Sequence, residues 1–181
     1  MIPLDWKRLH QEAKIVDLHI HPSMQQQLFR RNLNLRYVIN RSLHGNPMSV
    51  RASFPRLREG GYDVIFSTIY IPEYGILHDF PIVRLFRFLR PDLWKKLLTA
   101  EPFDATIRVM DDMEAAVASS SPTAPMKMAG STAELNAILA QPKGQRPIAV
   151  IHAVEGAHSL GVRKNQEDLI LQHLEMFIIS V

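Results

Sequence analysis

The sequence predicts an α/β fold of parallel strand–helix units, and three observations support this prediction. Apolar, β-branched runs of strand length occur at 14–18, 63–72 and 147–154, and amphipathic segments separate them. The second and third runs are almost continuously apolar, as in parallel strands that are buried on both faces. Histidines follow the first run and a glutamate follows the third, where barrel enzymes carry their functional residues.

A (β/α)8 TIM-type barrel usually takes about 250 residues, and this chain has 181. An apolar run at 177–181 is expected to begin a fourth strand, and the sequence stops inside it. We therefore expect residues 1–181 to form a single partial barrel domain. It would be the N-terminal half of a larger barrel, truncated at strand 4.

The first part of the chain is predicted to contain a helix, a strand and a long connection. Asp5 is a suitable N-cap for a helix over 5–13, which leads into the strand at 14–18. The polar stretch around 22–50 is expected to be a long loop. A loop of this length is either a functional lid or substrate loop, or a mobile surface insertion.

The middle of the chain is predicted to be mainly helical around one strand. A helix over 51–59 is expected to end at two consecutive glycines, before the strand at 63–72. The apolar segment 80–98 is expected to be helical and to be kinked or split by Pro91. A second amphipathic helix is expected over 104–118.

The last part of the chain is predicted to follow the same helix–strand pattern. Ser131 and Glu134 form a capping box, which predicts a helix that runs to about residue 141. The strand at 147–154 follows, and then a helix over 165–176.

Composition excludes several classes of protein. Hydrophobic residues make up 46% of the chain and charged residues 22%, which is ordinary for a soluble globular protein. The net charge is only +3, and no recognition motif accompanies the basic clusters, so a nucleic-acid partner is not expected. The absence of cysteine excludes disulfides, thiolate ligands and a cysteine nucleophile. No signal-peptide pattern and no membrane-span pattern occurs, which predicts a cytoplasmic location without a membrane span.

Two histidines follow the first strand, at His19 and His21, and a proline stops the run. Side chains alternate along a strand, so both imidazoles are expected on one face, where they could bind a metal ion. A pair of surface histidines in a loop is the alternative. Asp17 shares this face and is expected to accept a proton from a ligand histidine, or to form a hydrogen bond at the strand end.

The third strand ends in the run Glu155-Gly156-Ala157-His158-Ser159. Alternation places Glu155 on one face and His152 on the other, toward the helices, so His152 is not expected to be a ligand. His158 could orient the carboxylate of Glu155, or it could have a capping or surface role.

The run from Ala153 to Leu160 resembles the membrane (renal) dipeptidase family of metallopeptidases, which has a V-E-G-G-H-S-L type motif at the end of its third strand. The segment 58–72 is similar to the family's second-strand region. Residues 17–21 occupy the place of its first metal-binding motif. Three motifs in the right order span most of this chain.

The resemblance implies an amidohydrolase-like barrel that holds two zinc ions and hydrolyses dipeptides or related small amides. On the matching positions, His19 and His21 would bind the first ion, and Glu155 would bridge both ions and serve catalysis. The family usually has H-x-D at the first motif, so His21 removes one negative charge and leaves the metal and substrate class open. The remaining ligands and the general base would lie beyond Val181, so we expect this segment alone to be inactive.

Two alternatives remain open. A phosphoesterase of the polymerase-and-histidinol-phosphatase type also ends its first strand in D-x-H-x-H, but this assignment does not explain the run at 155–159. A non-catalytic barrel that has lost its site is the other alternative. In a half barrel, open strand edges further predict a homo-oligomer or a missing C-terminal half as partner.

Overall fold

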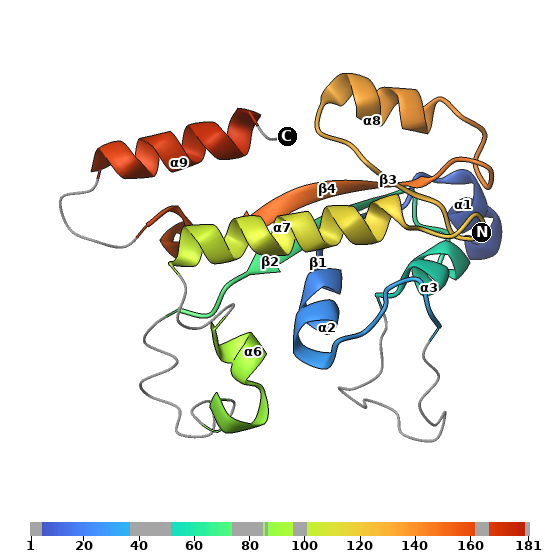
Figure 1. Cartoon of the computed structure of the whole chain (residues 1–181). Coiled ribbons are helices and arrows are strands. Elements are labelled where there is room, and N and C mark those ends of the chain that lie inside the picture. Colours follow the sequence, from blue (N-terminus) through green and yellow to red (C-terminus); the bar gives the residue numbers. More distant parts are fainter. Residues whose placement is uncertain are drawn as a thin grey trace.

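The structure, a computed structural model, describes residues 5–36, 52–73, 85, 87–95, 101–161 and 167–179. A four-stranded sheet forms its centre, with all neighbouring strands parallel and in the order β1-β2-β4-β3 (Figure 1). The strands are β1 (Val16–Ile20), β2 (Val64–Tyr70), β3 (Met126–Met128) and β4 (Ile148–Glu155). The predicted α/β class with a parallel sheet is confirmed.

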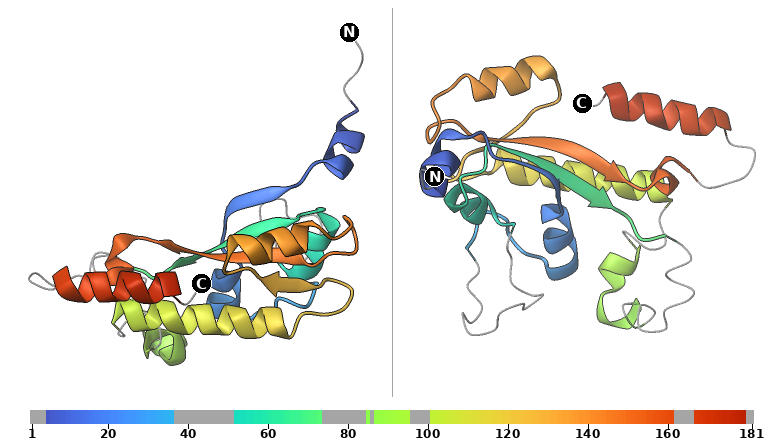
Figure 2. Two further views of the ribbon diagram at one scale, coloured as in Figure 1. Left: turned by 90° about the horizontal axis from the view of Figure 1, so that it is seen from above. Right: turned by 180° about the vertical axis from the view of Figure 1, so that it is seen from behind.

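Helices cover both faces of this sheet (Figures 1 and 2). They are α1 (Trp6–Glu12), α2 (Pro22–Phe29), α3 (Phe54–Glu59), α6 (Pro91–Leu93), α7 (Pro102–Ala118), α8 (Thr132–Leu139) and α9 (Glu167–Ile179), with the 3-10 turn η2 (Ala157–Leu160) after β4. On one face, Leu57 of α3 and Met113 of α7 pack with Ile65 of β2. On the other face, Ile138 of α8 packs with Ala149 of β4.

The strands β2 and β4 form the centre of the sheet. They pair without interruption from Val64 opposite Ala149 to Tyr70 opposite Glu155. The side chains on both faces of β2 are largely buried, as its apolar sequence predicts. The C-terminal ends of β2 and β4 therefore lie at the same edge of the sheet.

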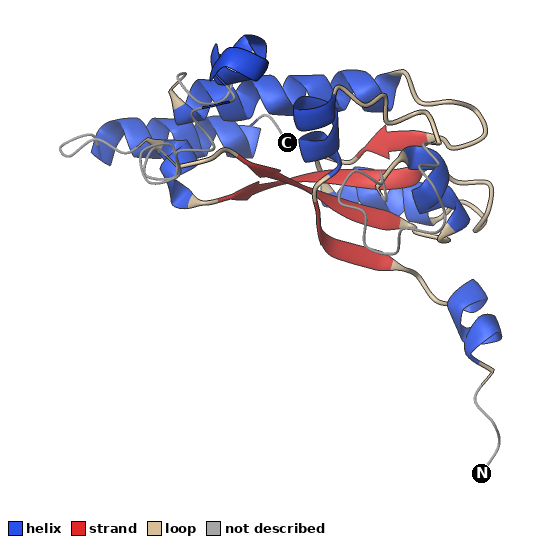
Figure 3. Ribbon diagram, turned by 90° about the horizontal axis from the view of Figure 1, so that it is seen from below, coloured by secondary structure: helices blue, strands red, loops and turns tan. Residues whose placement is uncertain are grey.

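Both predicted helix caps are present. The carboxylate of Asp5 accepts a hydrogen bond from the Arg8 N–H at 3.2 Å, and Ser131 Oγ accepts one from the Glu134 N–H at 3.2 Å. Helix α1 nevertheless has no buried residue. It projects from the sheet (Figures 2 and 3), and its His10 Nε2 lies 3.0 Å from the Gly60 carbonyl oxygen.

The predicted long loop around 22–50 is wrong at its start, because residues 22–29 form α2. Pro22 stands in the first turn of this helix, where its missing N–H costs nothing. The side-chain amides of Gln26 and Gln27 donate hydrogen bonds to the backbone and carboxylate oxygens of Asp112 on α7. Glutamines that suggested a loop thus pack α2 onto α7, while residues 37–50 lie outside the described part.

The predicted fourth strand is also wrong over 177–179, because α9 continues to Ile179. An apolar run this short is compatible with either a strand or a buried helix end. Phe177 packs beside Phe103 of α7, with ring centroids 5.3 Å apart, which settles this choice. Residues 180–181 lie outside the described part. The outer neighbour of β4 is instead β3, a three-residue strand that the sequence pattern did not reveal.

The remaining helices agree with their predictions to within a few residues. Within the predicted segment 80–98, residues 87–89 are helical and α6 begins at Pro91, so the predicted split is confirmed. Residues 80–84, 86 and 96–98 lie outside the described part. No described helix combines the length and apolar character needed to cross a membrane.

Candidate metal centre

Three side chains from separate elements converge at the C-terminal edge of the sheet. His19 lies near the end of β1, His21 is the N-cap residue of α2, and Glu155 ends β4. The two Nε2 atoms are 3.0 Å apart. Glu155 Oε2 is 3.4 Å from Nε2 of His19 and 3.5 Å from Nε2 of His21. The structure therefore brings together the three residues that the sequence suggested as ligands.

The position of His19 depends on a β-bulge. Asp17 pairs with Ile65 and Ile20 pairs with Ser67, so three steps along β1 match two along β2. Such an extra residue redirects the side chains of a strand. The carboxylate of Asp17 accepts a hydrogen bond from the backbone N–H of His19 at 3.0 Å. Of the two roles that the sequence suggested for Asp17, the structure shows the hydrogen bond at the strand end and not the bond to an imidazole.

His21 is held more firmly than His19. Pro22 and Ser23, which follow it, are buried, and Ser23 Oγ lies 3.4 Å from the carbonyl oxygen of Thr68 on β2. The His21 side chain is 27% exposed, compared with 61% for His19. Its Nδ1 is buried without a hydrogen-bond partner among the described residues. The other ring nitrogen, Nε2, lies 3.0 Å from His19 Nε2 and 3.5 Å from Glu155 Oε2.

The chemistry and spacing of these donors fit a zinc ion. Two imidazoles and one carboxylate form a known catalytic zinc set. Zinc–ligand bonds of 2.0–2.1 Å in a tetrahedron place ligand atoms roughly 3.3 Å apart. The three observed separations, 3.0, 3.4 and 3.5 Å, form a triangle of this size. Two imidazole nitrogens this close must share a proton or a cation, because their lone pairs repel each other.

His158 belongs to η2, and its ring contacts the segment that follows β2. Its Nε2 is 2.6 Å from the carbonyl oxygen of Ile71, and its Nδ1 is 3.8 Å from the carboxylate of Glu73. A carbonyl oxygen only accepts hydrogen bonds, so Nε2 carries the proton. Among the described residues, both ring nitrogens thus have partners other than Glu155. His158 connects the turn after β4 to the segment after β2.

His152 faces the helical layer, as predicted. Its Nε2 lies 3.2 Å from the carboxylate of Glu114 on α7. Burial lowers the pKa of His152 below its ordinary value of 6.5, although the hydrogen bond and charge of Glu114 and the charge of Asp111 act in the opposite direction. The ring is therefore neutral at pH 7.

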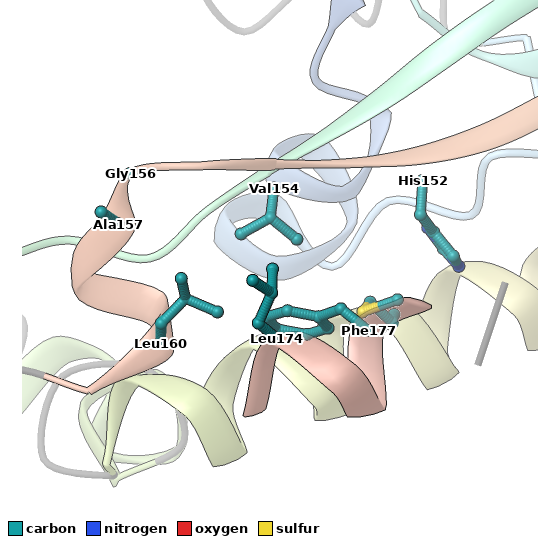
Figure 4. A pocket seen from close by; sticks show the side chains of 8 residues that line it. His152, Val154, Gly156, Ala157, Leu160, Leu174 and Phe177 are labelled. Atoms are coloured by element: carbon teal, nitrogen blue, oxygen red, sulfur yellow. The ribbon is translucent and has the colours of Figure 1, made fainter. Parts of the chain in front are cut away.

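A hollow of about 320 Å³ lies between β4, α7 and α9, on this same face of β4 (Figure 4). His152 and Val154 line it from the strand, and Leu174 and Phe177 line it from α9. Because side chains alternate along β4, this hollow is on the opposite face from Glu155. It is separate from the metal centre.

The sequence is similar to a known protein family. Residues 5–173 match the model of the family described as membrane dipeptidase (Peptidase family M19). The chain belongs to this family. No curated protein and no solved structure matches it.

His19, His21 and Glu155 lie within the range that matches the membrane dipeptidase family. The match over residues 5–173 confirms the resemblance found in the sequence motifs. Members of this family are metallopeptidases and typically depend on zinc. At the family level, the chain is a membrane-dipeptidase-like hydrolase. The His/Glu group at the sheet edge has the donor types that such a metallopeptidase needs.

Proposed function

We propose that this protein is a zinc-dependent hydrolase of dipeptides or related small amides, with its metal centre at His19, His21 and Glu155. One observation carries the proposal: three zinc-type donor atoms converge at the C-terminal edge of a parallel sheet, in a chain of the membrane dipeptidase family. This edge is where enzymes with parallel α/β barrels place their active sites.

Each residue has a defined role in this proposal. His19, His21 and Glu155 would hold the zinc ion, since their donor atoms converge at this edge of the sheet. A zinc ion at such a centre lowers the pKa of a bound water and polarises a carbonyl oxygen. Asp17 holds the backbone of His19 in the bulge, and so keeps its ring directed at Glu155.

We also propose that residues 1–181 form part of a (β/α)8 barrel and that this segment alone does not catalyse. The order β1-β2-β4 is that of successive barrel strands, and the outer edge of β1 is free among the described strands, which supports the proposal. Further strand–helix units would supply the general base and the remaining ligands. The cytoplasmic location is kept as a prediction.

Zinc content and dipeptide hydrolysis test the proposed function. We expect the 181-residue chain to bind zinc, and a longer natural form with further strand–helix units to hydrolyse unblocked dipeptides. Glu155→Gln should remove both properties, because it replaces the anionic ligand. Glu114→Gln is the matched control, since Glu114 contacts His152 on the other face of β4. Absence of zinc from the wild type, or hydrolysis that survives Glu155→Gln, would contradict the proposal.

A further inference from the structure

The hollow between β4, α7 and α9 is lined almost entirely by apolar side chains (Figure 4). Met110 of α7, Leu160 of η2 and Phe177 of α9 are among them, and no charged side chain belongs to the described lining. Such a surface does not suit an unblocked dipeptide, whose amino and carboxylate groups would lose water without gaining a charged partner. The lining therefore favours an uncharged, apolar occupant.

The size of the hollow indicates the size of this occupant. Its volume is about 320 Å³, whereas an apolar cavity of roughly 150 Å³ is enough to bind one benzene ring. Phe177 offers an aromatic ring in the wall, and aromatic rings gain from stacked or edge-to-face contacts with each other. A flat bicyclic aromatic molecule fits both the volume and the wall.

His152 is the one polar side chain in the described lining, and it lies at one end of the hollow (Figure 4). The side chain is only 4% exposed. Because a carboxylate accepts hydrogen bonds, Glu114, which lies 3.2 Å from Nε2, keeps the proton of the neutral ring on that nitrogen. Nδ1 is then an acceptor, and it is buried without a hydrogen-bond partner among the described residues.

An acceptor in this position calls for a donor. Buried polar atoms in native proteins almost always have a hydrogen-bond partner, so an exception needs an explanation. Water is a poor partner here, because a buried water molecule needs two to four polar groups and the other walls are apolar. An occupant with its own N–H or O–H group would donate to Nδ1 while its apolar body contacts the walls.

We propose that this hollow is a binding site for a flat bicyclic aromatic molecule with one hydrogen-bond donor, and that His152 accepts this hydrogen bond through Nδ1. Indole is the simplest compound of this class. The site lies on the opposite face of β4 from Glu155, so it is separate from the proposed hydrolase centre and does not depend on it.

Indole and 1-methylindole are the probes, because only indole carries a hydrogen on its ring nitrogen. Isothermal titration calorimetry of each compound into the 181-residue chain at pH 7 measures both dissociation constants. We expect indole to bind at least about tenfold more tightly than 1-methylindole, since the methylated ring leaves Nδ1 without a donor. His152→Leu removes the acceptor, so it should weaken indole binding and reduce this preference to about twofold or less.

Leu174→Glu tests the apolar wall. It places a carboxylate in the hollow and should weaken indole binding by at least about tenfold. Leu171→Glu is the matched control, because it makes the same change on α9 at a residue outside the described lining. The two leucines are 42% and 58% exposed, so we expect both variants to fold, and circular dichroism checks this for every variant. Glu155→Gln should leave indole binding unchanged, because it alters only the other face of β4.

Each of the other results would overturn a stated part of the inference. Equal binding of indole and 1-methylindole to the wild type would overturn the role of His152, and so would a tenfold preference that survives in folded His152→Leu. Loss of indole binding in Glu155→Gln would place indole at the metal centre instead. A wild type that binds no indole would overturn the site and leave the proposed function intact. If Leu174→Glu then also dissociated a dimer, the occupant would be a second copy of this chain.

Discussion

Asp63 connects three segments at the N-terminal edge of the sheet, opposite the metal centre. Its Oδ2 accepts a hydrogen bond from the Ile15 N–H at 2.8 Å, and its Oδ1 accepts one from Arg146 Nε at 3.0 Å. Burial alone would raise the pKa of Asp63. The hydrogen bonds from Arg146 and Ile15, with the charges of Arg146 and Lys143, outweigh burial and hold this pKa below its ordinary value of 3.8.

Replacement of Asp63 should strongly destabilise the fold. The side chains of Asp63 and Arg146 are only 4% and 6% exposed, so Asp63→Ala leaves a buried guanidinium without its carboxylate partner, which costs about 3–5 kcal/mol. Urea unfolding at pH 7 measures this loss. Glu12→Ala, which removes an exposed ion pair with Arg8, is the control and should have little effect. Equal urea midpoints for wild type and Asp63→Ala would contradict this account.

The same residue predicts an acid dependence of stability. Because the pKa of Asp63 is lower in the folded state than in the unfolded state, its contribution is complete above the unfolded value of about 3.8. It is lost as the pH falls through the lower folded value. Asp63→Asn should therefore reduce the slope of unfolding free energy against pH below about pH 4.

At the scale of elements, the turn from β4 into η2 requires glycine. Gly156 has a φ of +97°, and a Cβ there would lie 2.3 Å from Cε1 of His158. His158 cannot easily move away, because its ring is bonded to the Ile71 carbonyl oxygen. The turn directly follows Glu155, so its conformation affects the position of this proposed metal ligand.

Two glycine-to-alanine substitutions separate backbone strain from steric contact. Gly144 has a similar φ of +92°, but a Cβ there would meet nothing within 4 Å. Both substitutions should cost about 1–3 kcal/mol in backbone strain, and Gly156→Ala should cost more and also weaken zinc binding. Urea unfolding and zinc titration of the two variants measure the difference. Equal effects on stability and zinc affinity would show that the contact with His158 is unimportant.

At the scale of the whole molecule, β1 is an edge strand of the sheet among the described strands. Val16 and Leu18 are 46% and 68% exposed, although both are apolar strand residues. Exposed apolar edge strands readily pair with other chains, so we expect this chain to self-associate.

A charge on the edge strand should reduce this association. Leu18→Lys places a cation where natural proteins often protect an edge, and sedimentation velocity over a range of concentrations measures the result. Leu171→Lys on α9 is the control, because Leu171 is also exposed, at 58%, but belongs to a helix. A wild-type chain that remains monomeric at every concentration would argue against pairing through β1.

The sequence by itself determined the parallel strands and much of the candidate metal centre. The apolar runs of β2 and β4 predict strands in a sheet that is covered on both faces, because an uncovered face would expose their apolar side chains to water. Asp5 and Ser131 predicted their caps because capping depends only on neighbouring residues. The ligand group followed from the rule that the ends of parallel strands meet at one edge.

Only the tertiary structure decided the features that depend on distant partners. Gln27 favours a helix here because Asp112, 85 residues away, accepts its hydrogen bond. Phe177 is helical because it packs on Phe103 of α7. The bulge that directs His19 arises from pairing between β1 and β2. In such segments the local sequence leaves two backbone conformations nearly equal in energy. Contacts with residues distant in the sequence then select one of the two conformations.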